Sequence, residues 1–180
     1  MDGWLRSGHQ TIITSKIREA VSSINGEGFQ YLLNVMKHLK SEYHMIDKDK
    51  FMDLFRKRTA EEILVSGETV GCSDYAVLLC AFSRAKGIPA IFVEMIEESW
   101  LNSNDTKHYA NHDFCKVYLN KSWYWVDPVR GNVGIIGPYN VGGDKEYVLF
   151  AESLDSWDLG IKDWESYTKK YLEFRKKWKN

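Results

Sequence analysis

The stretch from Cys72 to Phe82 is apolar nearly all round a helix, and no other segment constrains the fold as strongly. A helix without a polar face cannot lie at the surface, so we expect this one at the centre of the molecule. Lys86-Gly87 ends it, with Gly87 as the left-handed cap, and Ile88-Pro89 turns the chain into a strand from Ala90 to Met95. Other elements must therefore cover this helix on every side.

The order of the remaining elements indicates the fold class. Apolar residues at helix spacing predict amphipathic helices over residues 13–24, 29–39 and 51–55, and a capping box from Thr59 to Glu62 begins a short helix that ends near Ser66-Gly67. Strand-forming runs come later, at residues 112–119, 122–126 and 147–150, and an amphipathic helix follows from about Ile161. Helices first and strands later predict an α+β fold in a single domain, residues 1–180.

The composition indicates which binding partners and which cellular compartment to expect. The 24 basic and 25 acidic residues nearly cancel, so nucleic acid and anionic membranes are not expected as partners. The three cysteines lack the spacing of a disulfide framework, which favours a reducing compartment. The sequence has neither a signal-peptide pattern nor an apolar run long enough to span a bilayer, so we expect a cytoplasmic protein. The oligomeric state is left open.

Three residues have the chemistry of a catalytic triad. Cys72 follows the loop that ends in Gly71 and opens the apolar helix, where the helix dipole is expected to hold the thiol pKa below about 8.5. If Asn120-Lys121 is a two-residue turn, Phe114 faces Asp127, and His112 lies diagonally from Asp127 on the same face. Such diagonal positions are about 7–8 Å apart, within reach of a hydrogen bond between imidazole and carboxylate. The approach of Cys72 to this hairpin does not follow from the sequence.

The chemistry of such a triad is nucleophilic catalysis. His112 would accept the proton of Cys72, and Asp127 would orient the imidazole and stabilise its charge. The thiolate would attack an amide carbonyl and leave an acyl-thioester, which water hydrolyses or an amine accepts. The backbone N–H of Cys72 is a candidate oxyanion donor, and a second donor is not identified.

Three blocks of the sequence resemble the transglutaminase-like superfamily, a branch of the papain-type cysteine enzymes. They are Gly71-Cys72-Ser73-Asp74-Tyr75-Ala76 with the Gly-Ile-Pro-Ala exit at residues 87–90, His112-Asp113-Phe114, and Trp123-Tyr124-Trp125-Val126-Asp127-Pro128. Together these blocks cover residues 58–130. The resemblance implies a Cys helix packed on an antiparallel sheet, with N-terminal helices and a C-terminal helix around this core. It also implies that Cys72 is the nucleophile, His112 the base and acid, and Asp127 the orienting group.

What the resemblance implies about substrates is broader. The family includes crosslinking transferases, proteases and peptide N-glycanases, so a peptide or protein amide is the expected substrate, and an amine is a possible acceptor. It also includes members without the triad, which keeps a non-catalytic binding module open as the alternative. Acidic clusters like the calcium sites of animal transglutaminases are not seen, so no cofactor is expected.

The sequence suggests less specific roles for several other residues. His108, His112 and Cys115 have a spacing that leaves a zinc site as a less favoured alternative. Trp100 is expected in a polar loop as a wall of the substrate cleft. Cys80 and Cys115 are expected in the core, Asp74 at the positive end of the helix dipole, and the basic residues of the last helix on a solvated face.

Overall fold

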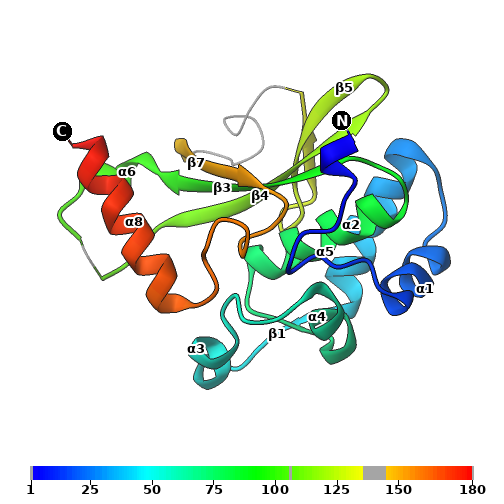
Figure 1. Cartoon of the computed structure of the whole chain (residues 1–180), viewed down its shortest axis with the longest axis horizontal. Helices are drawn as coiled ribbons and strands as arrows, with labels where there is room; N and C mark the ends of the chain where they lie inside the picture. Colours follow the sequence, from blue (N-terminus) through cyan, green and yellow to red (C-terminus); the bar gives the residue numbers. More distant parts are fainter. Residues whose placement is uncertain (1, 106, 136–144, 180) are drawn as a thin grey trace.

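The computed structural model describes residues 2–105, 107–135 and 145–179. Its main sheet is antiparallel and has five strands in the order β6-β5-β4-β3-β7. Helices lie mainly on one face of this sheet (Figure 1). The sheet strands are β3 (Ala90–Glu97), β4 (Asn111–Leu119), β5 (Ser122–Asp127), β6 (Asn132–Gly134) and β7 (Tyr147–Ser153). The α+β prediction is confirmed.

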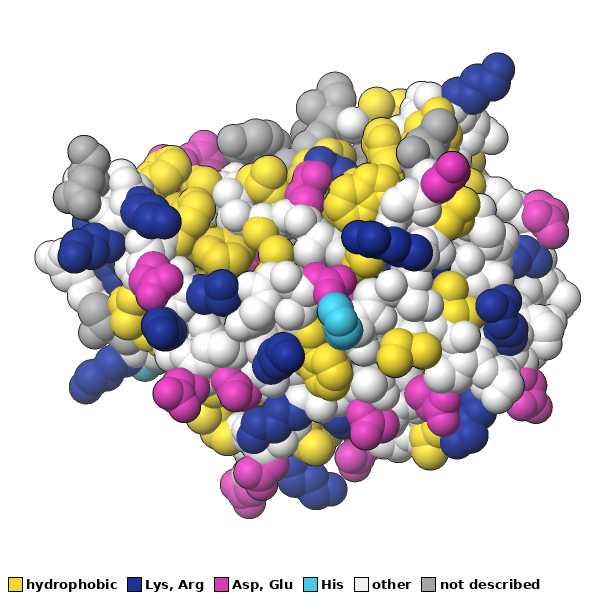
Figure 2. Space-filling view, viewed as in Figure 1, with side chains coloured by type: hydrophobic (Ala, Val, Ile, Leu, Met, Phe, Trp, Pro, Cys, Tyr) yellow, Lys and Arg dark blue, Asp and Glu magenta, His cyan; other side chains and the backbone are white. Residues whose placement is uncertain are grey.

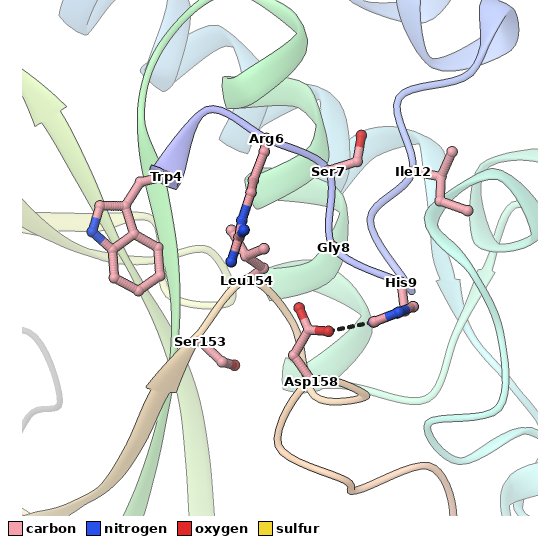
Figure 3. Close-up of a pocket in the computed structure, with 9 residues that line it drawn as sticks. All are labelled: Trp4, Arg6, Ser7, Gly8, His9, Ile12, Ser153, Leu154 and Asp158. Carbon is pink, nitrogen blue, oxygen red and sulfur yellow. Dashed lines mark hydrogen bonds and ion pairs between the residues drawn. The ribbon is translucent and has the colours of Figure 1, made fainter. Parts of the chain in front are cut away.

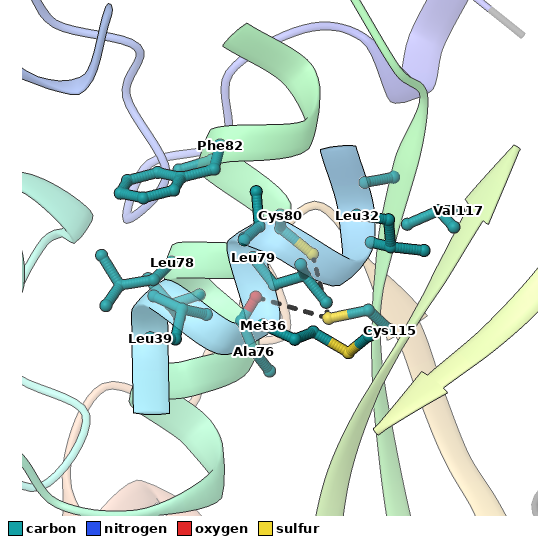
Figure 4. Close-up of a cluster of buried hydrophobic side chains, with 14 of the residues drawn as sticks. Leu32, Met36, Leu39, Ala76, Leu78, Leu79, Cys80, Phe82, Cys115 and Val117 are labelled. Atoms are coloured by element: carbon teal, nitrogen blue, oxygen red, sulfur yellow. Dashed lines mark hydrogen bonds between the residues drawn. The ribbon is translucent and has the colours of Figure 1, made fainter. Parts of the chain in front are cut away.

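The helix α5 (Cys72–Ala85) occupies the centre, as its apolar circumference predicts. It packs against β3 and β4, and three N-terminal helices pack around it. These are α1 (Ser15–Ser23), α2 (Gly28–Glu42) and α4 (Ala60–Ser66). Figure 4 shows side chains of α2, α5 and β4 meeting in this core. Cys80 and Cys115 are both fully buried there, with their sulfur atoms 3.6 Å apart, which confirms their assignment to the core.

Local signals in the sequence account for several element ends. Thr59 caps α4 through the predicted box, in which its Oγ1 accepts from the N–H of Glu62 and its own N–H donates to the Glu62 carboxylate. Gly67 ends α4 at a φ of 66°, and Gly87 follows α5 at a φ of 82°. Both lie in the left-handed region that glycine adopts without steric cost.

The hairpin between β4 and β5 has the predicted register. Asn120 and Lys121 have φ values of 49° and 65°, as a two-residue type I′ turn requires. Leu119 pairs with Ser122, and the ladder continues to Cys115 and Val126. Beyond this pair the β4–β5 ladder ends, and at this level His112 pairs with Met95 of β3 while Asp127 pairs with Asn132 of β6.

Several elements differ from the sequence-based prediction. Trp100 was expected in a polar loop but lies in a short helix, α6 (Glu98–Asn102), and β7 extends three residues beyond the predicted end at Phe150. The last helix, α8 (Trp164–Trp178), begins three residues after Ile161 because the Asp163 carboxylate caps it. A small parallel pair, β1 (His44–Met45) with β2 (Glu68–Thr69), was not predicted, nor was β6. The several Gly residues and the Pro within residues 131–143 predict turns there, and the part of this region from residue 136 onward lies outside the described residues.

The remaining short elements join these parts. They are η1 (Asp2–Trp4), η2 (Lys48–Lys50) and α3 (Phe51–Leu54). In Figure 2, Lys and Arg side chains gather over the end of the molecule that α8 forms. Lys169, Lys176, Lys177 and Lys179 are exposed, as the predicted solvated face requires, but Arg175 is buried and stacks on Trp100, so the prediction is wrong for this residue. Within the described residues, no helix has both the length and the apolar character needed to cross a membrane.

Candidate active site

The loop before Cys72 is fixed by a buried carboxylate. Asp74 Oδ2 accepts hydrogen bonds from the N–H of Val70, at 2.9 Å, and from the Arg58 guanidinium, at 2.6 Å. Gly71, the N-cap of α5, has a φ of 124°, a conformation that residues with a side chain rarely adopt. Asp74 lies in the first turn of α5, at the positive end of the helix dipole as expected, and its principal contacts also hold this loop against Arg58. The start of α5 is therefore a pre-organised position for Cys72.

The thiol of Cys72 contacts a carboxylate. Its Sγ donates to Asp113 Oδ2 over 3.6 Å, although part of the residue's surface stays accessible. Desolvation by the surrounding protein, and then the negative charge of Asp113, raise the pKa of the Cys72 thiol above its usual value. The expectation of a lowered pKa is therefore wrong for this arrangement. The helix dipole favours the thiolate by a fraction of a kcal/mol to about 2 kcal/mol, and desolvation of the sulfur together with the Asp113 charge outweighs it.

Asp113 belongs to a buried charge cluster that the sequence analysis missed. Arg56 is fully buried and donates from Nη1 to Glu94 Oε2 at 2.9 Å and from Nη2 to Asp113 Oδ2 at 3.0 Å. Glu94 and Asp113 are directly paired across β3 and β4, and Tyr171 of α8 donates to Glu94 Oε1 at 2.6 Å. Burial raises the pKa of Glu94 to about 7, with Arg56 opposing the shift and Asp113 adding to it. We call these four residues the Arg56 cluster.

One signal for this cluster was present in the sequence. Glu94 is the only charged residue in an otherwise apolar run from Ala90 to Ile96, and β3 is buried along nearly its whole length. A carboxylate in such a strand requires a buried cation or a bound proton. Arg56 gave no comparable signal, because it lies beside Lys57 and Arg58 and resembles a surface residue.

His112 and Asp127 form the pair that the hairpin register predicts. His112 Nε2 lies 2.8 Å from Asp127 Oδ2, and both side chains are at least nine-tenths buried. Asp127 Oδ1 accepts from the N–H groups of Val129 and Arg130, each at 3.0 Å. Burial opposes ionisation of Asp127, but hydrogen bonds from His112 and Arg130 outweigh it and lower the pKa of this carboxyl. Asp127 therefore presents a fixed negative charge to Nε2, which leaves Nδ1 as the nitrogen available for another partner.

Cys72 and His112 approach β4 from different sides. Asp113 points toward α5 and the thiol, while the His112 ring packs against Phe114 and Tyr147, with ring centroids 4.6 and 6.2 Å apart. Within the described residues, the structure records no hydrogen bond between Cys72 and His112. The structure thus pairs His112 with Asp127, as predicted, and places Cys72 beside Asp113 rather than beside His112. The catalytic roles of all three remain a prediction.

Three further expectations concern residues near the site. Trp100 lies in α6 and is 3% exposed, stacked beneath the Arg175 guanidinium at 4.4 Å, so it is not placed to form the wall of an open cleft. His108 is a surface residue paired with Asp105 at 2.8 Å, whereas Cys115 is in the core. In the part of the chain that the structure describes, no three His, Cys, Asp or Glu side chains are grouped to hold a metal ion. The zinc alternative therefore has no geometric support.

Comparisons with known proteins identify the family. The family model of the transglutaminase-like superfamily matches residues 21–128, a span that contains Cys72, His112 and Asp127. The chain belongs to this superfamily. No curated protein sequence matches it.

A solved structure supports the same fold. The crystal structure of a "putative cysteine protease" from Cytophaga hutchinsonii superimposes with a TM-score of 0.64 at 17% sequence identity. The match covers 88% of this chain and 48% of the other, so this chain spans about half the length of that protein. At this identity the likeness is one of fold.

Proposed function

We propose that this protein is a cysteine-dependent enzyme that cleaves or transfers amide bonds through an acyl-thioester on Cys72. The observation that carries the proposal is the buried His112–Asp127 pair, whose geometry leaves Nδ1 as the free basic nitrogen. Cys72 begins a central helix and contacts Asp113, the residue bonded to His112. Peptide or protein amides are the proposed substrates, with water or an amine as acceptor.

The chemistry proceeds in two balanced steps. His112 Nδ1 takes the proton of the Cys72 thiol, and the thiolate attacks the amide carbonyl to form a tetrahedral oxyanion. Collapse of this intermediate breaks the C–N bond, and the imidazolium returns its proton to the departing amine. In the second step, water or an amine gives its proton to His112 and attacks the thioester, which restores the thiol. Throughout, Asp127 stabilises the imidazolium without accepting its proton.

This mechanism requires the Cys72 sulfur to leave Asp113. One change of side-chain rotamer moves a Sγ atom by about 3 Å, and β4 and β5 are not paired with each other at the level of His112. We propose that the contact with Asp113 is the resting state and that substrate binding shifts the Cys72 sulfur from Asp113 toward His112 Nδ1, around the strand β4 that separates them in the resting state. The raised pKa of the thiol is then a property of the resting state only.

The same contact favours one alternative, a binding module that retains the superfamily fold. A thiol held neutral by a carboxylate is a poor nucleophile, and a protein that never releases it would have no turnover. The two functions differ in one measurable property, the reactivity of Cys72 in the native protein.

Alkylation by iodoacetamide, followed by mass spectrometry of the three cysteine-containing peptides, tests the proposal. Cys80 and Cys115 are fully buried and serve as internal controls. Faster labelling of Cys72 than of either control, reduced when His112 is replaced by Ala, is the expected result. Equal protection of all three cysteines in the folded protein would count in favour of the binding module.

Turnover is tested with a panel of peptide amides and glutamine donors, each with and without a primary amine. Cys72→Ala is expected to abolish activity with the fold retained, and Asp127→Asn to lower kcat far more than KM. Cys80→Ala is the matched control, since it removes a thiol from the same helix. Activity that survives Cys72→Ala would refute the acyl-thioester route.

A further inference from the structure

A pocket of about 550 Å³ lies between the N-terminal segment and the residues that follow β7. Figure 3 shows Trp4, Arg6 and His9 on the N-terminal segment, across from Leu154 and Asp158. None of these residues belongs to the candidate active site. The volume falls within the range of about 300–1,000 Å³ that is usual for small-molecule sites.

The base of this pocket is rigid. Asp155 Oδ2 accepts from the N–H groups of Gln10 and Thr11, at 2.8 and 3.0 Å, and Arg84 donates to Thr11 Oγ1 and to the carbonyl of Leu154, each at 2.7 Å. A Cβ atom at Gly8 would lie 2.2 Å from Asp155 Oδ2, so only glycine permits this close approach. The N-terminal segment is thereby held against α5 and the end of β7, and the pocket is preformed.

Two complementary charges in the pocket have unused hydrogen-bonding capacity. Arg6 has no hydrogen-bond or ion-pair partner among the described residues, and its guanidinium presents donors that match a carboxylate. Asp158 Oδ1 is bound by His9 Nδ1, while in the described part of the chain Oδ2 has no partner. Asp158 keeps 21% of its side-chain surface exposed, so Oδ2 can accept from a ligand.

Apolar surface completes the site. The Trp4 indole is partly buried against the outer face of the sheet, and Ile12 is 49% exposed at the rim. Leu154 lies at the base. A ligand that uses all of these groups carries a carboxylate, an ammonium group and an apolar body.

We propose that this pocket binds a small zwitterion, an apolar α-amino acid or the free dipeptide that contains it. Arg6 takes the carboxylate, Asp158 Oδ2 takes the ammonium group, and the apolar side chain packs on Trp4 and Leu154. This binding is independent of the Cys72 chemistry, since no residue is shared between the two sites.

Calorimetric titration of the full chain with four probes tests the proposal. The probes are L-phenylalanine, the dipeptide Phe-Phe, 3-phenylpropionate, which lacks the amine, and phenethylamine, which lacks the carboxylate. Saturable binding of the amino acid or the dipeptide, about tenfold or more tighter than either single-charge analogue, is the expected result. Tighter binding of L-phenylalanine would indicate a free amino acid as the ligand, and tighter binding of Phe-Phe would indicate a dipeptide. Binding of 3-phenylpropionate or phenethylamine as tightly as the zwitterions, or no saturable binding of any probe, would overturn the proposal.

Matched variants locate the site. Arg6→Gln and Asp158→Asn are each expected to weaken binding of the zwitterion by about tenfold or more, because each removes a charged hydrogen bond. Arg18→Gln removes a charge from an exposed position of α1 and is expected to leave binding unchanged. The same titration with Cys72→Ala keeps the affinity of the unmodified chain. Equal affinities for Arg6→Gln and Arg18→Gln would place the ligand elsewhere.

Discussion

The contact between Cys72 and Asp113 allows a quantitative test of how the nucleophile is controlled. We predict that Asp113→Asn increases the reactivity of Cys72 near neutral pH. A full negative charge 3.6 Å from the sulfur disfavours the thiolate by roughly 5 kcal/mol at an effective dielectric constant of about 20. Arg56 Nη2, 3.0 Å from the same oxygen, offsets most of this cost.

If a net cost of about 1.4 kcal/mol is left after this offset, removing the charge of Asp113 increases the fraction of Cys72 thiolate about tenfold. A thiolate of lower pKa is also less nucleophilic, so the rate of alkylation is expected to rise by about threefold rather than tenfold. The substitution should be tolerated, because the Arg56 cluster contains one cation and two carboxylates. With Asn at position 113, the positive charge of Arg56 is left with one carboxylate, that of Glu94.

The assay is the rate of iodoacetamide labelling of Cys72 between about pH 6 and 10, with circular dichroism as the check on folding. Asp53→Asn, which removes a carboxylate from an exposed position of α3, is the matched control. The rate profile of Asp113→Asn should shift to lower pH, and that of Asp53→Asn should not. A folded Asp113→Asn protein with an unchanged or slower rate would refute the electrostatic reasoning.

Three further predictions concern stability. The folded-state pKa of Glu94 is raised to about 7, so the contribution of this carboxyl to the free energy of unfolding is greatest below its unfolded-state pKa and falls as pH rises toward 7. Glu94→Gln should therefore flatten the decline in melting temperature between about pH 5 and 8. A pH dependence identical to that of the unmodified chain would exclude Glu94 as the group responsible. Gly71→Ala should destabilise the fold by about 1–3 kcal/mol in urea titrations. The cause is backbone strain at a φ of 124° and not steric overlap, since the nearest atom to the new Cβ is 4.0 Å away. Thr59→Ala should cost about 1 kcal/mol in the same titration by removing one half of the capping box, and a loss as small as that of an exposed substitution would argue against that box.

Local sequence patterns predicted much of the fold correctly, and the reasons are particular to each element. The apolar circumference of α5 required burial, the Thr59 box and Gly67 bounded α4, and the Asn120-Lys121 turn set the register that brings His112 to Asp127. Each of these signals depends on residues close together in the chain. The short helix α6 and the strand β6 had no such signal and were missed.

The sequence by itself determined the central helix, the hairpin and the pairing of imidazole with carboxylate, because helix periodicity, strand alternation and turn geometry act over a few residues. Only the tertiary structure decided the environment of the Cys72 sulfur. That environment depends on Arg56, Glu94 and Asp113, which come from three separate segments and meet where α5 packs on the sheet. Their charges act through space in a desolvated interior, and no local pattern records which distant side chains will share it.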